Sequence, residues 1–111
     1  MFERKLNDML SVLNEEEMCL VQQNRKDEAA FVRIRMNIVN IGKTVWQVVL
    51  RTEKAEMQKS VYIAKMAALR HTWQESGSRA EKYQDHDKAM IEEIKLNTLE
   101  QVIDAFEECV L

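Results

Sequence analysis

Two histidines are the residues whose neighbours could support acid–base, phosphotransfer or metal chemistry. His86 lies between Asp85 and Asp87, but adjacent residues at the start of a helix cannot all reach one metal ion. A carboxylate at that place is more often an N-cap, and we expect this role for the Asp-His-Asp run. His71 and Glu75 are four residues apart and share a helix face, which predicts a hydrogen-bonded surface pair.

The sequence lacks the usual catalytic and cofactor signatures. The di-iron bundle signature needs Glu-x-x-His on two helices, whereas Ala68 precedes His71 at that spacing and Tyr83 precedes His86. A phosphotransfer histidine is usually followed by a lysine and a small residue, and Thr72 and an aromatic residue follow His71 instead. No Gly-rich phosphate loop, Gly-x-Ser-x-Gly elbow or Cys nucleophile with an orienting His is present. We therefore expect a protein that is not an enzyme and that carries no cofactor and no metal ion.

Cys19 and Cys109 are two lone thiols without CxxC spacing. A helical domain of this size does not need a disulfide to fold, and a bridge is the less favoured alternative. The residues after Met1 mix charge into the first turn, which is unlike a secretory signal, and no apolar run is long enough to cross a bilayer. These features predict a cytoplasmic protein.

The composition favours one all-α domain over residues 1–111. Hydrophobic residues make up 46% of the chain and charged residues 32%, which is typical of a folded protein. The chain has no proline and only two glycines, so it has little material for the tight turns of an all-β fold. The net charge is -3, and the basic residues of the second segment scatter around a helix, so we expect neither nucleic acid nor a membrane as a partner.

Charge is unevenly distributed along the chain. Residues 1–24 and 87–111 are acidic, whereas residues 25–54 are basic. Because opposite charges favour neighbouring elements, we expect the second helix to pack between the first and the last, within one chain or across a dimer.

The first segment has the apolar spacing of an amphipathic helix that ends near Gln23. Asn24 suits an N-cap, and Asp27 and Glu28 would then lie in the first turn of a second helix. So short a connection predicts two antiparallel helices, and one long kinked helix is the open alternative. The apolar stripe consists of Phe2, Leu6, Met9, Leu13 and Leu20.

The segment from about 26 to 52 is predicted to be a helix that is apolar on more than one face. Steps of three and four residues make an a/d seam of Phe31, Ile34, Ile38, Ile41, Val45 and Val48. A second row lies beside it and consists of Val32, Met36, Val39, Trp46 and Leu50. Together the rows cover about two-thirds of the circumference, so the helix must be central in a bundle or lie in a subunit interface. We expect a homodimer, and the candidate interface is Ile34, Ile38, Ile41, Val45 and Val48.

Two further residues of this helix carry specific expectations. Gly42 lies within the apolar arc, where another helix backbone could approach closely. Arg35 projects toward the same arc and needs a carboxylate partner or a route to solvent.

The remaining segments predict two or three more helices. A helix from about 56 to 70 is apolar on two faces, and we expect its methionines to fill the core. Ser76-Gly77-Ser78 favours a break, whereas the spacing from Trp73 onward favours a continuous helix, so both readings stay open. The last helix is expected over about 87–109, with an inner face of Ile91, Ile94, Thr98, Val102, Ala105 and Phe106.

From Asn24 onward the chain resembles a family of small uncharacterised all-helical proteins of Firmicutes-type bacteria. The resemblance begins with Asn24-Arg25-Lys26-Asp27-Glu28-Ala29-Ala30-Phe31 and continues through Ile34, Asn37-Ile38, Ile41 and Lys43-Thr44-Val45. It extends to Trp73, Ala80-Glu81-Lys82, His86 and Ile91-Glu92-Glu93-Ile94-Lys95-Leu96. It implies a compact helical domain, a bacterial source and a helix that runs through Trp73 to about Gln84. It implies no activity, because no catalytic or ligand-binding residues are assigned in that family.

These observations predict a bundle of four to five helices that acts as a self-associating, non-catalytic interaction module, with an unidentified protein partner as a further option. The alternative is a small-ligand-binding bundle in which methionines and aromatic residues line a pocket and Arg35 meets an anion. The candidate pocket residues are Arg35, Trp46, Tyr62 and Trp73.

Overall fold

The computed structural model describes residues 1–110, which form four α-helices and no strand. The helices are α1 (Phe2–Gln22), α2 (Lys26–Thr52), α3 (Ala55–Lys82) and α4 (His86–Cys109). The expected all-α bundle is therefore confirmed, with four helices. In the described residues no helix is long and apolar enough to cross a membrane.

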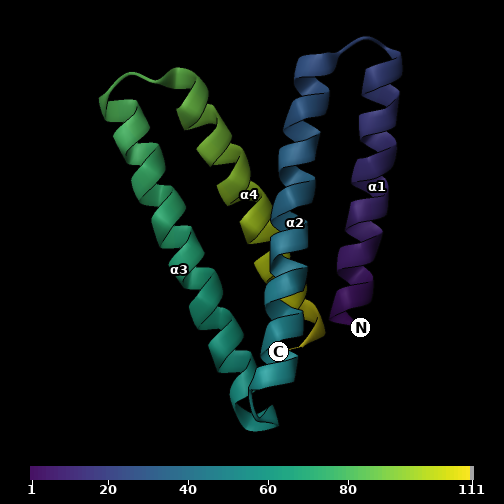
Figure 1. Ribbon diagram of the computed structural model, residues 1–111, viewed down its shortest axis with the longest axis vertical. Coiled ribbons are helices and arrows are strands. Elements are labelled where there is room, and N and C mark those ends of the chain that lie inside the picture. The colour runs from purple at the N-terminus through teal and green to yellow at the C-terminus, as the bar shows by residue number, and fades with distance from the viewer. Residues whose placement is uncertain (111) are drawn as a thin grey trace.

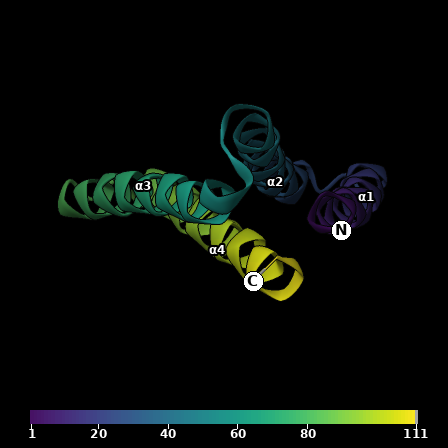
Figure 2. The ribbon, with the colours of Figure 1, turned by 90° about the horizontal axis from the view of Figure 1, so that it is seen from below.

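The four helices form two hairpins that splay apart as a V (Figure 1). One hairpin is α1 with α2 and the other is α3 with α4, and both hairpin turns lie at the open end of the V. Seen from below, α1 and α3 lie at the two outer sides of the molecule, and α2 and α4 lie between them (Figure 2). The molecule is flat, with extents of 46 × 35 × 21 Å.

The first hairpin turn corrects the expectation for Asn24. Asn24 has a φ of 60° and ends α1 instead of capping α2. Its N–H donates to the carbonyl oxygen of Val21 at 3.0 Å, and the N–H of Arg25 donates to that of Leu20 at 2.9 Å. These two bonds close a Schellman motif, whose left-handed residue is commonly Gly or Asn. The asparagine was a correct boundary signal, but it acts on the preceding helix.

The second hairpin turn repeats the first one sixty residues later. Gln84 has a φ of 58°, against 60° for Asn24. Its N–H donates to the carbonyl oxygen of Glu81 at 3.0 Å, and the N–H of Asp85 donates to that of Ala80 at 2.8 Å. Asp85 then caps α4, because its Oδ1 accepts the N–H of Lys88 at 3.2 Å. The expected cap in the Asp-His-Asp run is confirmed.

The sixty-residue offset also relates the cores of the two hairpins. Buried Phe2 and Leu6 of α1 correspond to buried Tyr62 and Met66 of α3. Along α2 and α4 the burial pattern of residues 31–40 matches that of residues 91–100 at every position. The chain is thus an internal repeat of one helical hairpin, a feature that the sequence analysis did not detect.

An aromatic cluster joins the hairpins where the V closes. Its members form two pairs at the sixty-residue offset, Phe2 with Tyr62 and Trp46 with Phe106. All four rings contact one another, with centroid distances between 4.5 and 5.9 Å. Edge-to-face contacts of this kind add to the free energy gained by burying the rings. The Tyr62 hydroxyl donates to the carbonyl oxygen of Gly42 at 3.0 Å and so satisfies its own buried polar group.

Gly42 lies where α2 approaches α4 and α3. A Cβ built at this position would lie 2.8 Å from Cγ1 of Val102, a distance that real Cβ atoms essentially never show. Val102 is the counterpart of Gly42 at the sixty-residue offset. The close approach at Gly42 is made by side chains of α4 and α3 and not by another helix backbone, as had been expected, and the glycine makes room for its own counterpart in the repeat.

The structure settles the alternatives left open for the third helix. α3 runs through Ser76, Gly77 and Ser78 without a break and ends at Lys82. Thr72 lies within α3, and its hydroxyl donates to the carbonyl oxygen of Ala68 at 3.0 Å. The continuous-helix reading is therefore confirmed, and the helix expected over 56–70 is longer than its apolar pattern indicated.

Candidate functional site

Helix α2 is one of the two inner helices, and like α4 it contacts the other three helices. Its buried side includes Val32, Val39, Trp46 and Val49. These residues belong mostly to the second apolar row, so this row, more than the a/d seam, faces the chain's own core. The expectation that α2 is central is confirmed.

The opposite side of α2 is nearly free of charge. From Met36 to Leu50 the one charged residue is Lys43, and its Nζ donates to Oδ1 of Asn7 on α1 at 2.7 Å. Charged residues make up 32% of the chain, so a long helix surface without an unbonded charged side chain is unusual. We call this surface the α2 strip and define it as Asn37, Asn40, Ile41, Thr44, Val45 and Val48.

The α2 strip contains a shallow depression. Its volume is about 520 Å³, and Asn37, Asn40, Ile41, Thr44 and Val45 line it. Apolar side chains and short uncharged polar side chains alternate here along the helix. Depletion of charge at the centre of a surface patch is the compositional mark of protein interfaces.

The candidate interface residues lie along the border between the core and this strip. Ile41 is 37% exposed, and Ile34, Val45 and Val48 are half-buried. Ile38 is only 2% exposed and packs within the core of its own chain, so it cannot be an interface residue without a change of fold. The a/d seam therefore leaves four of its five candidate residues partly open to a second molecule.

Helix α4 offers an internal comparison for the α2 strip. Counterparts of Asn40, Ile41 and Thr44 at the sixty-residue offset are Glu100, Gln101 and Asp104. Glu100 is held by Arg70, whose Nε lies 2.6 Å from its Oε1. The same position in the repeat is thus acidic on α4 and neutral on α2.

The four candidate pocket residues do not surround one cavity. Trp46 and Tyr62 pack on each other with ring centroids 5.2 Å apart in the aromatic cluster. Tyr62 borders a small cavity of about 120 Å³, and none of the other three residues lines it. Trp73 lies elsewhere on α3, where Nζ of Lys95 stands 5.8 Å from the centre of its ring. Arg35 is half-buried on α2.

A second surface was missed by the sequence analysis. An apolar groove of about 650 Å³ lies between α1 and the end of α4, and its lining includes Met1, Met9, Val12 and Cys109. The ion pair between Lys5 and Glu108 lies beside it, and the hydrogen bond to Glu108 raises the pKa of Lys5. Val12 could have indicated this groove, because it is an apolar residue that lies outside the predicted apolar stripe of α1.

The remaining reactive side chains are placed as surface groups. Nε2 of His71 lies 3.2 Å from Oε1 of Glu75, so the expected pair of neighbouring side chains lies on the surface of α3. Cys19 and Cys109 are free thiols. Within residues 1–110 no group of three or more His, Cys, Asp or Glu side chains is placed to hold a metal ion.

No family model, curated protein or solved structure matches this chain in the comparisons with known proteins. The resemblance seen from Asn24 onward therefore stays a prediction.

Proposed function

We propose that the protein is a cytoplasmic, non-catalytic interaction module that self-associates by packing the α2 strip of one copy on the α2 strip of a second copy. The observation that supports this proposal is the uncharged side of the central helix, with Ile41 exposed at its centre. Burying Ile41, Val45 and Val48 against a second molecule would remove apolar surface that the chain itself leaves in water.

A second copy suits this surface better than a charged partner does. Because the strip carries no charge, two copies can meet without repulsion between like charges. Asn37 and Asn40 could hydrogen-bond across the interface and fix its register, as a polar residue does in a coiled-coil seam. The counterpart surface on α4 holds the Arg70–Glu100 ion pair and Asp104, so covering it with a second copy would remove charged groups from water at a cost.

The experiment is sedimentation equilibrium of the wild type and of two matched glutamate variants. Ile41→Glu places a charge at the centre of the α2 strip, and Gln101→Glu places the same charge at the counterpart position on α4. We expect a dimer for the wild type and for Gln101→Glu, and a monomer for Ile41→Glu. Circular dichroism checks that both variants keep the helical content of the wild type.

Two results would contradict the proposal. One is a wild type that remains monomeric at every concentration reached. The other is a folded Ile41→Glu variant that dimerises as well as Gln101→Glu does, because the interface would then lie elsewhere.

A further inference from the structure

Helix α3 has a second apolar side that its own chain leaves largely uncovered. Steps of four, three and four residues define this side, which we call the α3 face and which consists of Met57, Val61, Ala64 and Ala68. Met57 is 48% exposed, so it does not fill the core as expected, whereas Met66 on the other side of α3 is 1% exposed. Ala64 and Ala68 are exposed as well. Two sides of α3 are therefore apolar, and mainly one of them packs within the chain.

The α3 face continues the surface of the α2 strip. Helices α2 and α3 contact each other and are joined by the short connection of Glu53 and Lys54. Val45 of the α2 strip and Val61 of the α3 face pack against the same core cluster. The two surfaces thus meet above a shared part of the core.

The internal repeat shows how the two surfaces face each other. The groove between α1 and α4 is lined by Asp8 from α1 and by Gln101 from α4. Their counterparts at the sixty-residue offset are Ala68 and Ile41. The repeat therefore puts Ala68 of the α3 face and Ile41 of the α2 strip on facing walls of the corresponding groove between α3 and α2.

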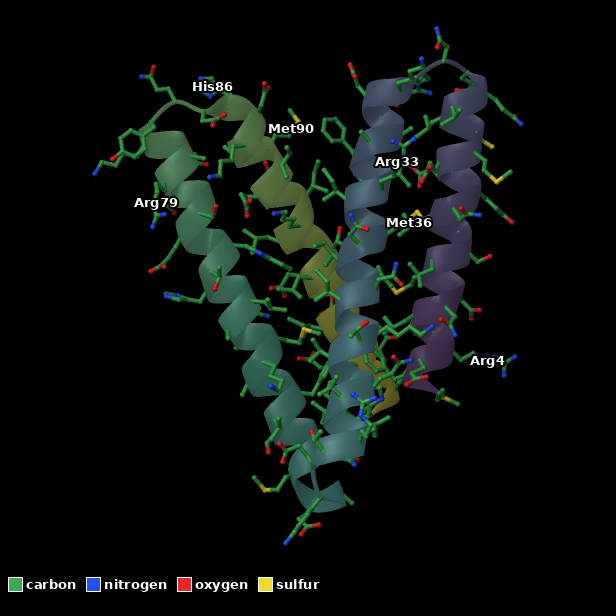
Figure 3. All side chains as sticks on the ribbon, viewed as in Figure 1. Arg4, Arg33, Met36, Arg79, His86 and Met90 are labelled. Carbon is green, nitrogen blue, oxygen red and sulfur yellow. The ribbon has the colours of Figure 1, made fainter. Side chains whose placement is uncertain are left out.

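Charge distinguishes these two corresponding grooves. Where the α3 face has Ala64 and Ala68, α1 has Arg4 and Asp8. Figure 3 shows the Arg4 side chain extending from α1 away from the other helices. The α2 strip differs from α4 in the same sense, as described above. The two helices that border one groove are thus both neutral where their counterparts are charged.

Lys65 is a charged residue that remains beside the neutral groove. Its counterpart Lys5 pairs with Glu108, whose place on α2 is taken by Val48. Lys65 is exposed, and a lysine can cover apolar surface with its stem while its ammonium group stays in water. A second molecule can therefore pack on the α3 face without burying this charge.

The hydroxyl groups beside the α3 face are already hydrogen-bonded. Oγ of Ser60 donates to the carbonyl oxygen of Met57 at 3.1 Å, and Oγ1 of Thr72 donates to that of Ala68 at 3.0 Å. Because both hydroxyl protons are bonded to the backbone of their own helix, covering them leaves no buried donor unpaired. Covering the corresponding side of α1 would instead remove charged groups from water.

A stable dimer needs more surface than the α2 strip alone offers. Stable interfaces bury about 800 Å² on each partner and involve roughly 20–30 residues a side. The α2 strip consists of six residues on one helix. Its flank toward α1 carries the ion pair between Arg33 and Glu17, whereas its flank toward α3 is apolar. The α3 face is therefore the surface that can extend the interface.

We propose that the α2 strip and the α3 face form one interface, on which a second copy of this chain packs through the same surface. This inference rests on the proposed self-association through the α2 strip and names the second helix that takes part. Helices α2 and α3 of two copies then form a four-helix bundle, in which Ile41 and Val45 of one copy pack against Ala64 and Ala68 of the other. Small side chains opposite larger ones let the helices approach closely.

The experiment measures the dimer dissociation constant by sedimentation equilibrium for the wild type and for variants of two adjacent alanines. Ala68→Glu places a carboxylate on the α3 face, and Ala67→Glu places the same group on another side of α3. We expect Ala68→Glu to raise the dissociation constant about tenfold or more, because a buried unpaired carboxylate is costly. We expect Ala67→Glu to change it by no more than about twofold, as an ordinary surface substitution does. Circular dichroism checks that both variants keep the helical content of the wild type.

A second measurement locates the interface without any substitution. Isotope-filtered NOE spectroscopy of a mixture of ¹³C-labelled and unlabelled wild type reports contacts between copies only. We expect contacts from the methyl groups of Ile41 and Val45 in one copy to those of Ala64 and Ala68 in the other.

The results separate this inference from the proposed function. A dimer that Ile41→Glu disrupts and Ala68→Glu leaves intact would overturn the inference and leave the proposed function standing. Contacts between copies that are confined to α2 would do the same. Equal weakening by Ala68→Glu and Ala67→Glu would also overturn the inference, because the place of the charge would then not matter. A wild type that stays monomeric would overturn the proposed function and this inference with it.

Discussion

At the scale of single residues, the hydroxyl of Tyr62 links two helices at the core of the molecule. It donates to the carbonyl oxygen of Gly42 at 3.0 Å, and burial raises the pKa of Tyr62 above its ordinary value of 10.0. We expect Tyr62→Phe to lower the free energy of unfolding by about 1 kcal/mol at neutral pH. Urea unfolding at a fixed protein concentration measures this change.

The raised pKa of Tyr62 also gives the wild type an alkaline limit. Above about pH 10 the unfolded chain releases the Tyr62 proton while the folded chain keeps it, so the folded state binds more protons. Stability contributed by this group is full below pH 10 and is lost as pH rises further. The difference between wild type and Tyr62→Phe should therefore shrink above pH 10. A Tyr83→Phe control, whose ring is exposed, should show no such change.

Gly42 supports a second expectation at the residue scale. A Cβ at this position would lie 2.8 Å from Cγ1 of Val102, so Gly42→Ala requires the Val102 side chain or the two helices to shift. We expect a net loss of about 1–2 kcal/mol, since overpacking outweighs the better helix propensity of alanine. Urea unfolding of Gly42→Ala, Val102→Ala and the double variant tests the contact. Costs that simply add would contradict it, because removal of Cγ1 should relieve the clash.

At the scale of the elements, both hairpins turn on a residue in the left-handed region. Asparagine tolerates that conformation better than glutamine does, and glycine adopts it without penalty. Gln84→Gly should therefore raise the free energy of unfolding by up to about 1 kcal/mol, and Asn24→Gly should raise it less. Thermal unfolding compares the two variants. A larger gain from Asn24→Gly would contradict this account of the turns.

Helix boundaries could be predicted where polar residues interrupt an apolar pattern. The segment expected over 26–52 matches α2 (Lys26–Thr52), because apolar spacing persists along its whole length. The end of α3 was less readable, because Ser76, Gly77 and Ser78 are typical of loops. Packing overrides this local preference: Ser76 and Gly77 are half-buried, and Ala80 is buried. Asn24 shows the same limit, since one residue type marks both the end and the start of helices.

The internal repeat could not be found from residue identity. Across the two hairpins the conserved quantity is burial, while the residues themselves differ, as with Trp46 and Phe106 or Gly42 and Val102. The sequence was sufficient to predict which face of α2 holds the candidate interface. The sequence alone could not show that Ile38 turns into the core while Ile41 stays exposed, because that border depends on where α4 crosses α2.

At the scale of the whole molecule, the two hairpins share one architecture and differ in surface character. The first presents the uncharged α2 strip, whereas the second carries Glu100 and Asp104 at the corresponding positions of α4. A chain built in this way can present two different surfaces on one scaffold. We propose self-association through the α2 strip of the first hairpin, continued by the α3 face.

The most direct test of self-association is native mass spectrometry of unlabelled protein mixed with ¹⁵N-labelled protein. We expect a mixed dimer, with a mass between those of the two pure dimers, for the wild type, and monomers alone for Ile41→Glu. A wild-type spectrum that contains monomers alone would contradict the central claim. A mixed dimer that persists in Ile41→Glu would equally contradict the assignment of the interface to the α2 strip.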